Sequence, residues 1–292
     1  MSTVMQFLQA TFAPLVLIFT VSNLAAMGLQ VKVPDVLVAL RNKKSMALIF
    51  VWGWVLGPAF GFLITRVLPL DEPYVIVVLL ASLAPCAPFL QQMVVKARGD
   101  MGFTGAFIPL VVVGTVVLMP VMAPVLIKGL TISPSALARP LLLTILVPLV
   151  IGAAFRYYAD TVATRIFPAV KSIALLATLA TVVWCLVLYG RGMLDTAGSL
   201  ALLSMTLFMV GMAVITYRFG FGMKQNQRSV MALGMGTRNI AAVLAAALAI
   251  PDADPRIVVM VVMWTLWSVV LAAIGAKLFA DRARALAAGD AA

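Results

Sequence analysis

Residues 73–95 read PYVIVVLLASLAPCAPFLQQMVV, a run of 23 residues without a charged side chain. About 20 apolar residues are enough to cross the hydrocarbon interior of a bilayer as an α-helix. Two prolines, Pro85 and Pro88, lie in the middle of the run, where each removes a helix hydrogen bond and clashes with the preceding turn. The stretch therefore predicts a transmembrane helix that is interrupted near the midplane of the membrane.

Apolar runs of similar length fill the rest of the chain and are joined by short connections. Long runs that are apolar on every side exclude a β-barrel, whose strands are short and alternate in polarity. The sequence therefore predicts an all-α integral membrane protein with about nine transmembrane helices. The predicted segments are residues 5–27, 46–66, 73–95, 103–127, 137–156, 168–190, 198–218, 230–250 and 257–279.

The overall composition excludes a soluble enzyme. The chain is 64% hydrophobic and 11% charged, whereas soluble domains are about 45–50% apolar and about 25% charged. It has no His, and Cys86 and Cys185 both lie inside apolar runs, so we expect no metal site and no cofactor. An acidic dyad and a G-x-S-x-G motif are also missing from the sequence, so we expect no enzymatic activity.

Basic residues lie in the gaps between segments and are unequally divided between the two sides of the membrane. One set of gaps holds fifteen and the other holds five, and Arg238 is the remaining one of the 21. Because cytoplasmic loops are enriched in Lys and Arg, this division predicts an external N-terminus and a cytoplasmic C-terminus in the inner (plasma) membrane. The excess of basic residues favours contact with anionic lipid of the bilayer over nucleic acid.

A second interrupted segment is predicted at residues 230–250, which contain Gly234 and Gly236 in the stretch GMGTRN. Paired glycines make an unwound stretch inexpensive. The two interrupted segments lie five segments apart and therefore run in opposite directions. Interrupted helices in corresponding places of two inverted halves are typical of the binding site of a secondary transporter. We therefore predict a first repeat of four helices at 1–130 and a second of five at 131–292.

Arg238 is the only charged residue in the middle of a predicted segment. Inserting an arginine at the centre of a transmembrane helix costs roughly 2.5–3.5 kcal/mol. The position of Arg238 therefore calls for a partner or a function. All acidic residues fall in gaps, at segment edges or in the tail, so a negatively charged substrate is one candidate partner. The alternative is that Arg238 caps carbonyls freed by the broken helix. The other predicted substrate contacts are polar residues near the breaks: Thr237, Asn239, Gln91 and Thr104.

Three motifs, in this order and spacing, resemble the bile acid:sodium symporter family over nearly the whole chain. They are FTVSNLAAMGLQ at 19–30, SLAP at 82–85 leading to KARGD at 96–100, and GM at 234–235 followed by NIAAVLA at 239–245. The resemblance implies two inverted repeats, with two broken helices that cross in a core domain beside a panel domain. A nine-helix form that lacks the first helix of the family fold matches the predicted segments.

The same resemblance implies that the sodium ligands of the family are largely replaced here. The family's Glu and Gln correspond to Ala232 and Gly236, and its cation-binding stretch in the first broken helix corresponds to residues 86–91, CAPFLQ. Its hydroxyl ligands on the next helix correspond to Thr104 and Ile108, of which only Thr104 has a hydroxyl. Sodium remains possible as a coupling ion, but the loss of these ligands argues against it.

Together these features predict a secondary transporter that carries a small organic anion by alternating access. Two alternatives remain open at this point. One is conventional sodium-coupled symport of an organic anion, with backbone carbonyls as sodium ligands. The other is a membrane sensor or partner-binding subunit that keeps the fold without transport.

Overall fold

The computed structural model describes residues 3–127 and 132–289, and every regular element in these ranges is a helix. Seven continuous helices are long and apolar enough to cross a membrane. They are α1 (Thr3–Gly28), α3–η1–α4 (Lys43–Phe50, Val51–Leu56, Gly57–Val67), α7 (Met101–Leu126), α8–η2–α9 (Pro134–Leu141, Leu142–Leu146, Val147–Tyr158), α10 (Asp160–Gly198), α11 (Ala201–Arg218) and α14 (Pro255–Gly289).

Two further segments are each divided into a pair of short helices. The third predicted segment forms α5 (Glu72–Ser82) and α6 (Leu90–Lys96), and the eighth forms α12 (Gln225–Gly236) and α13 (Ile240–Leu248). With the seven continuous helices, the described ranges therefore contain nine apolar segments in the predicted order. The all-α membrane fold and both predicted interruptions are confirmed.

Three features of the helices differ from the expectations. A nine-residue helix, α2 (Val33–Arg41), fills a gap that we expected to be a loop. Helix α10 is 39 residues long, because it includes residues 160–167 and 191–198 on either side of the predicted apolar segment 168–190. The π-helical stretches η1 and η2 each end just before a proline, Pro58 and Pro148, whose missing N–H shifts the hydrogen bonding of the preceding turn.

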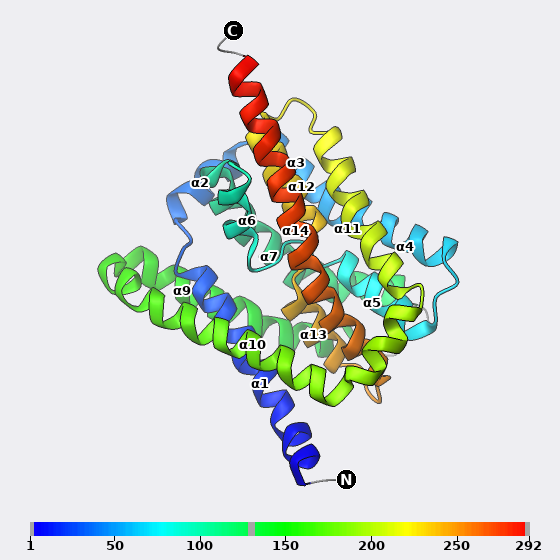
Figure 1. Cartoon of the computed structure of the whole chain (residues 1–292). Coiled ribbons are helices and arrows are strands. Elements are labelled where there is room, and N and C mark those ends of the chain that lie inside the picture. The colour runs from blue at the N-terminus through cyan, green and yellow to red at the C-terminus, as the bar shows by residue number, and fades with distance from the viewer. Residues whose placement is uncertain (1–2, 128–131, 290–292) are drawn as a thin grey trace.

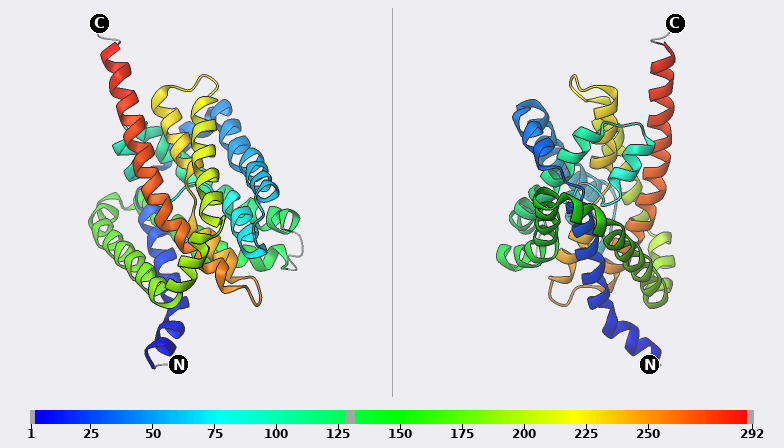
Figure 2. Two further views of the ribbon diagram at one scale, coloured as in Figure 1. Left: turned by 45° about the vertical axis from the view of Figure 1, so that its right-hand side comes forward. Right: turned by 90° about the vertical axis from the view of Figure 1, so that its left-hand side faces the viewer.

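The helices form two layers, which are visible from two directions in Figures 1 and 2. Helices α1, α9 and α10 pack against one another in one layer, which we call the panel layer. The two broken segments lie in the other layer, the core layer, together with α3, α4, α7, α11 and α14. The two ends of the chain lie at opposite ends of the molecule (Figure 2). The predicted boundary between repeats, at 130/131, lies outside the described residues, and the division into repeats stays a prediction.

Contacts between distant gaps agree with the predicted division of the connections into two sides. Arg256 at the start of α14 forms ion pairs with Asp254 (2.9 Å) and with Asp71 just before α5 (2.8 Å), all on the predicted external side. The hydrogen bond from Arg256 lowers the pKa of Asp254 and keeps this carboxylate charged. On the opposite side, Gln227 donates to Asp100 over 3.3 Å. Which side faces the cytoplasm stays a prediction.

Candidate functional site

The break between α5 and α6 lies at residues 83–89 and is locked by bonds from the second broken helix. Cys86 adopts a positive φ of 77°, which is uncommon for a residue other than glycine. Its backbone N–H donates to the carbonyls of Gly234 (2.9 Å) and Thr237 (3.0 Å). Pro85 is buried and Pro88 is half-buried. The unwound stretch therefore has defined hydrogen-bond partners and is not a simple kink.

The second break consists of Thr237, Arg238 and Asn239, between α12 and α13. Its backbone pairs with the first break in a short antiparallel bridge between Pro85 and Arg238. The Asn239 N–H donates to the Ala84 carbonyl over 2.8 Å, and the Asn239 side chain caps α13 by accepting from Ala242 N–H. The two broken helices therefore meet at their interruptions, as the family resemblance implied.

Thr237 joins the two breaks through its side chain. Its Oγ1 accepts a hydrogen bond from Ala87 N–H over 3.1 Å and donates to the Leu233 carbonyl over 2.7 Å. Only 2% of the surface of Thr237 is exposed, so both hydrogen bonds are protected from water. Thr237 thus holds the crossing together, and this is a structural role that was not expected from the sequence.

Arg238 is completely buried at the crossing point, with 0% of its surface exposed. Its Nη2 donates to the carbonyl of Met235, and its guanidinium carbon lies 4.4 Å from the centre of the Phe208 ring. Both partners are neutral. The Nε and Nη1 atoms are buried without a hydrogen-bond partner, and the ion pairs of the described residues do not include Arg238. An unpaired buried charge is costly, so the site contains one uncompensated positive charge.

Asn239, the next residue, also has a free donor. Its Nδ2 group is buried without a partner, although the oxygen of the same amide caps α13. Buried polar groups in proteins nearly always have a partner, and each exception calls for an explanation. The second break therefore contains three buried donors without partners, two on Arg238 and one on Asn239.

Glycines allow the close packing around the crossing. A Cβ on Gly234 would lie 2.3 Å from the Phe107 ring of α7, and a Cβ on Gly236 would lie 3.0 Å from the Met209 carbonyl of α11. A Cβ at Gly234 would force the Phe107 ring to shift, whereas a Cβ at Gly236 would need its neighbours to move by only a few tenths of an ångström. Gly234 is therefore the position at which the packing of α12 most favours glycine.

The roles of Gln91 and Thr104 as substrate contacts stay predictions. Gln91 is half-buried on α6, and the hydroxyl of Thr104 donates to the Asp100 carbonyl one turn earlier in α7 (2.7 Å). Neither forms a hydrogen bond with residues 237–239 in the described structure. Ala232 and Gly236, the positions at which the sequence resemblance implied sodium ligands, are buried in α12 and have no side-chain oxygen.

Two aromatic residues at the site were missed in the sequence. Phe208, whose ring faces the Arg238 guanidinium, and Phe107, which packs on Gly234, lie inside ordinary apolar segments. No polar residue or break in the sequence distinguishes them from other lipid-facing or buried aromatics. Only the three-dimensional crossing of the broken helices shows their role.

Comparison with known proteins places the chain in a family. It is 21% identical over 193 residues to a probable sodium/metabolite cotransporter of chloroplasts, BASS3, from Oryza sativa subsp. japonica. The match covers 66% of this chain and 46% of the rice protein, so the chain spans about half the length of this relative. The model of the Sodium Bile acid symporter family matches residues 14–195, which include the first break and stop before the second. The chain belongs to the sodium bile acid symporter family.

Proposed function

We propose that this protein is a secondary transporter that binds a small organic anion at the crossing of its two broken helices. The observation that carries the proposal is the buried Arg238 guanidinium, which has two unpartnered nitrogens and no carboxylate partner among the described residues. The Met235 carbonyl and the Phe208 ring hold the group in place but do not neutralise its charge. A mobile anion would supply the missing charge.

The surroundings of Arg238 favour an anion for two further reasons. Helix α13 begins at Ile240, directly after the break, so the positive end of its dipole points toward the crossing. The Asn239 Nδ2 group, on the next residue of the break, is a further buried donor without a partner. A guanidinium binds a carboxylate or sulfonate through strong charge-assisted hydrogen bonds, and the free Nε and Nη1 atoms are donors for such bonds.

Two cavities lie near the second broken helix, both toward the predicted cytoplasmic ends of the helices that line them. Arg238 lines neither of them. One cavity, of about 260 Å³, ends at Phe107, which packs on Gly234. The other, of about 350 Å³, lies between α11, α12 and α14 and reaches Gly236 and Thr237. Because Arg238 is completely buried, we propose alternating access, in which an anion reaches it when the broken helices move relative to their neighbours, as in transporters with midplane sites.

Sodium-coupled symport is the second candidate. The name of the family and that of the rice relative both include sodium, and this favours coupling. Against it, the positions of the family's Glu and Gln are Ala232 and Gly236, which offer only backbone oxygens. We propose that the fixed charge of Arg238 takes over the electrostatic role of the coupling cation, and that transport of the anion does not require sodium.

Two experiments test the proposal in sequence. First, the purified full chain is screened for an increase in melting temperature with a panel of small carboxylates and sulfonates, because a ligand that binds only the native state stabilises it. Second, uptake of the best ligand into proteoliposomes is measured in sodium and in potassium. Equal uptake in the two salts supports the proposal. Uptake only with sodium would support the symport alternative, and failure of every anion in both experiments would favour a sensor.

A further inference from the structure

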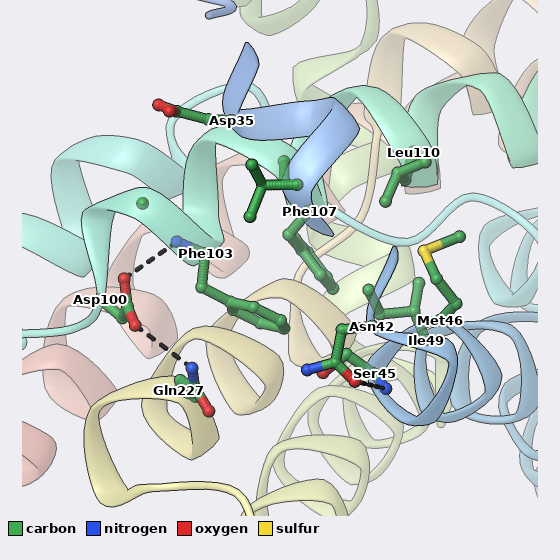
Figure 3. Close-up of a pocket in the computed structure, with 13 residues that line it drawn as sticks. Asp35, Asn42, Ser45, Met46, Ile49, Asp100, Phe103, Phe107, Leu110 and Gln227 are labelled. Carbon is green, nitrogen blue, oxygen red and sulfur yellow. Dashed lines mark hydrogen bonds between the residues drawn. The ribbon is translucent and has the colours of Figure 1, made fainter. Parts of the chain in front are cut away.

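The smaller of the two cavities lies between α2, α3, α7 and α12, and its charged side chains are opposite in sign to Arg238. Its volume is about 260 Å³, and thirteen residues line it (Figure 3). Two of them, Asp35 and Asp100, are acidic, and none of the thirteen is basic. This composition contrasts with the loops on the same side of the molecule, which are rich in Lys and Arg. The cavity therefore disfavours the anion proposed for the crossing.

The inner part of the cavity is aromatic and aliphatic. The rings of Phe103 and Phe107 point into it and are separated by 6.0 Å between their centres. Met46, Ile49 and Leu110 form the facing wall in Figure 3. Asn42, Ser45 and Gln227 add neutral polar groups. Small inorganic cations need a shell of several oxygen ligands, whereas aromatic rings favour an organic cation.

We propose that this cavity binds a small organic ammonium compound. The positive group would lie between the two carboxylates and the faces of the Phe103 and Phe107 rings, since aromatic rings attract ammonium groups through their negative faces. The apolar body of the ligand would fill the space against Met46, Ile49 and Leu110. The amides of Asn42 and Gln227 and the hydroxyl of Ser45 would orient any further polar group.

The cavity is connected directly to the second broken helix. Gln227 belongs to α12 and donates to Asp100 over 3.3 Å, and the Asp100 N–H donates to the Asn226 carbonyl over the same distance. At the inner end, Phe107 lies so close to Gly234 that no side-chain atom fits between them. A bound ammonium compound therefore contacts α12, the helix that leads into the break containing Arg238. Its binding is expected to change the mobility of α12.

A set of probes of the same shape and different charge tests this site. Choline is compared with dimethylbutanol, its neutral carbon isostere, and with dimethylbutanoate, which carries a negative charge. Binding to the purified full chain is measured by calorimetry in potassium chloride. We expect choline to bind roughly tenfold more tightly than dimethylbutanol, as expected for an ammonium desolvated against aromatic rings and a carboxylate. Dimethylbutanoate should not displace bound choline, because the cavity disfavours its negative charge, and any binding of this carboxylate would be at Arg238 instead.

Two variants locate the binding to this cavity without disturbing the fold. Asp100→Asn removes the charge but keeps the N-cap of α7, because Asn and Asp are equally favourable N-cap residues. Asp35→Asn removes the other charge from the exposed first turn of α2. We expect each to weaken choline binding several-fold and to leave dimethylbutanol unaffected, while Asp281→Asn on the far end of α14 changes neither.

Three results would overturn the inference. They are equal binding of choline and dimethylbutanol, choline binding that both Asn variants leave intact, and no binding of choline. None of these outcomes bears on anion binding at Arg238, so the failure of this site and the failure of the proposed function are separable.

Discussion

At the scale of single residues, Gly234 is the position where the packing of the crossing leaves least room. Gly234→Ala would place a Cβ 2.3 Å from the Phe107 ring, and overpacking of this kind typically costs about 1–3 kcal/mol. We expect a lower melting temperature of the purified protein. Gly105→Ala in α7 is the matched control, since its Cβ would meet no atom within 4 Å.

The double variant Gly234→Ala/Phe107→Leu distinguishes the contact from a general effect of the substitution. A smaller side chain at 107 should recover part of the lost melting temperature, and the coupling between the two substitutions measures the contact. If Gly234→Ala is as stable as Gly105→Ala, the two helices do not pack as described.

Thr237 is the second position at which a single atom is decisive. Thr237→Val removes the acceptor of the Ala87 N–H and leaves that buried donor without a partner, which typically costs about 1–3 kcal/mol. Thr237→Ser keeps the hydroxyl and should lose much less stability. Thermal unfolding of the two variants in the same detergent is the measurement, and equal melting temperatures would show that the hydroxyl does not join the breaks.

Arg238 could be identified from the sequence because charged residues are rare in apolar segments, so a single one stands out. It was not informative about the partners of that charge. Phe208 and the Met235 carbonyl become partners only after α11 and α12 pack, and backbone carbonyls have no signature in the side-chain sequence. The alternative considered from the sequence, that Arg238 caps carbonyls of the broken helix, is partly present in the structure. Arg238 donates to one such carbonyl, that of Met235 in α12.

At the scale of elements, Pro85 and Pro88 are predicted to keep the third segment open. Replacing both by Ala removes a penalty of about 3 kcal/mol per proline in a helix interior, so we expect a continuous helix, normal insertion and loss of anion uptake. The loss follows because residues 83–89 would no longer form the hydrogen bonds with Gly234, Thr237 and Asn239 across the crossing. Uptake into proteoliposomes and the yield of folded protein are measured together.

Pro124→Ala is the control for the proline variants, since Pro124 lies inside the continuous helix α7. It should leave uptake unchanged. Unaltered uptake in the Pro85→Ala/Pro88→Ala protein would show that these prolines only bend a scaffold helix, and that the bonds from Thr237 and Gly234 alone maintain the break.

The number and order of the segments could be predicted because the thickness of a bilayer fixes the length of an apolar helix. The breaks could be predicted because Pro and Gly act locally on the backbone. Helix α2 could not, since nine amphipathic residues between charged positions look like a connection. The cavity beside α2 was missed for the same reason: it depends on Asp35 and Asp100, which come from two different gaps and meet only in the fold.

At the scale of the whole molecule, the charge bias predicts the orientation of every connection. Reporter fusions after Gly99, Ala159 and Gln225 should behave as cytoplasmic. Fusions after Asp71, Ser133 and Asp252 should behave as external. The ion pair between Arg256 and Asp71 already requires two of the external positions to share a side. Two or more fusions with the opposite behaviour would contradict both the orientation and the inverted relationship of the broken helices.

The central claim is that Arg238, and not sodium, provides the positive charge that binds the substrate anion. The most direct measurement is the affinity of the purified protein for the anion identified in the screen, in sodium and in potassium at constant ionic strength, for the parent, Arg238→Ala and Arg238→Lys. We predict equal affinity in both salts for the parent. Arg238→Ala should lose about 2–5 kcal/mol of binding, a thirty-fold or greater decrease, without a lower melting temperature, because a buried unpaired charge is removed. Arg238→Lys should keep part of the affinity, since an ammonium cannot form the two parallel bonds of a guanidinium. A strong sodium requirement in the parent protein, or unchanged affinity in Arg238→Ala, would contradict the claim.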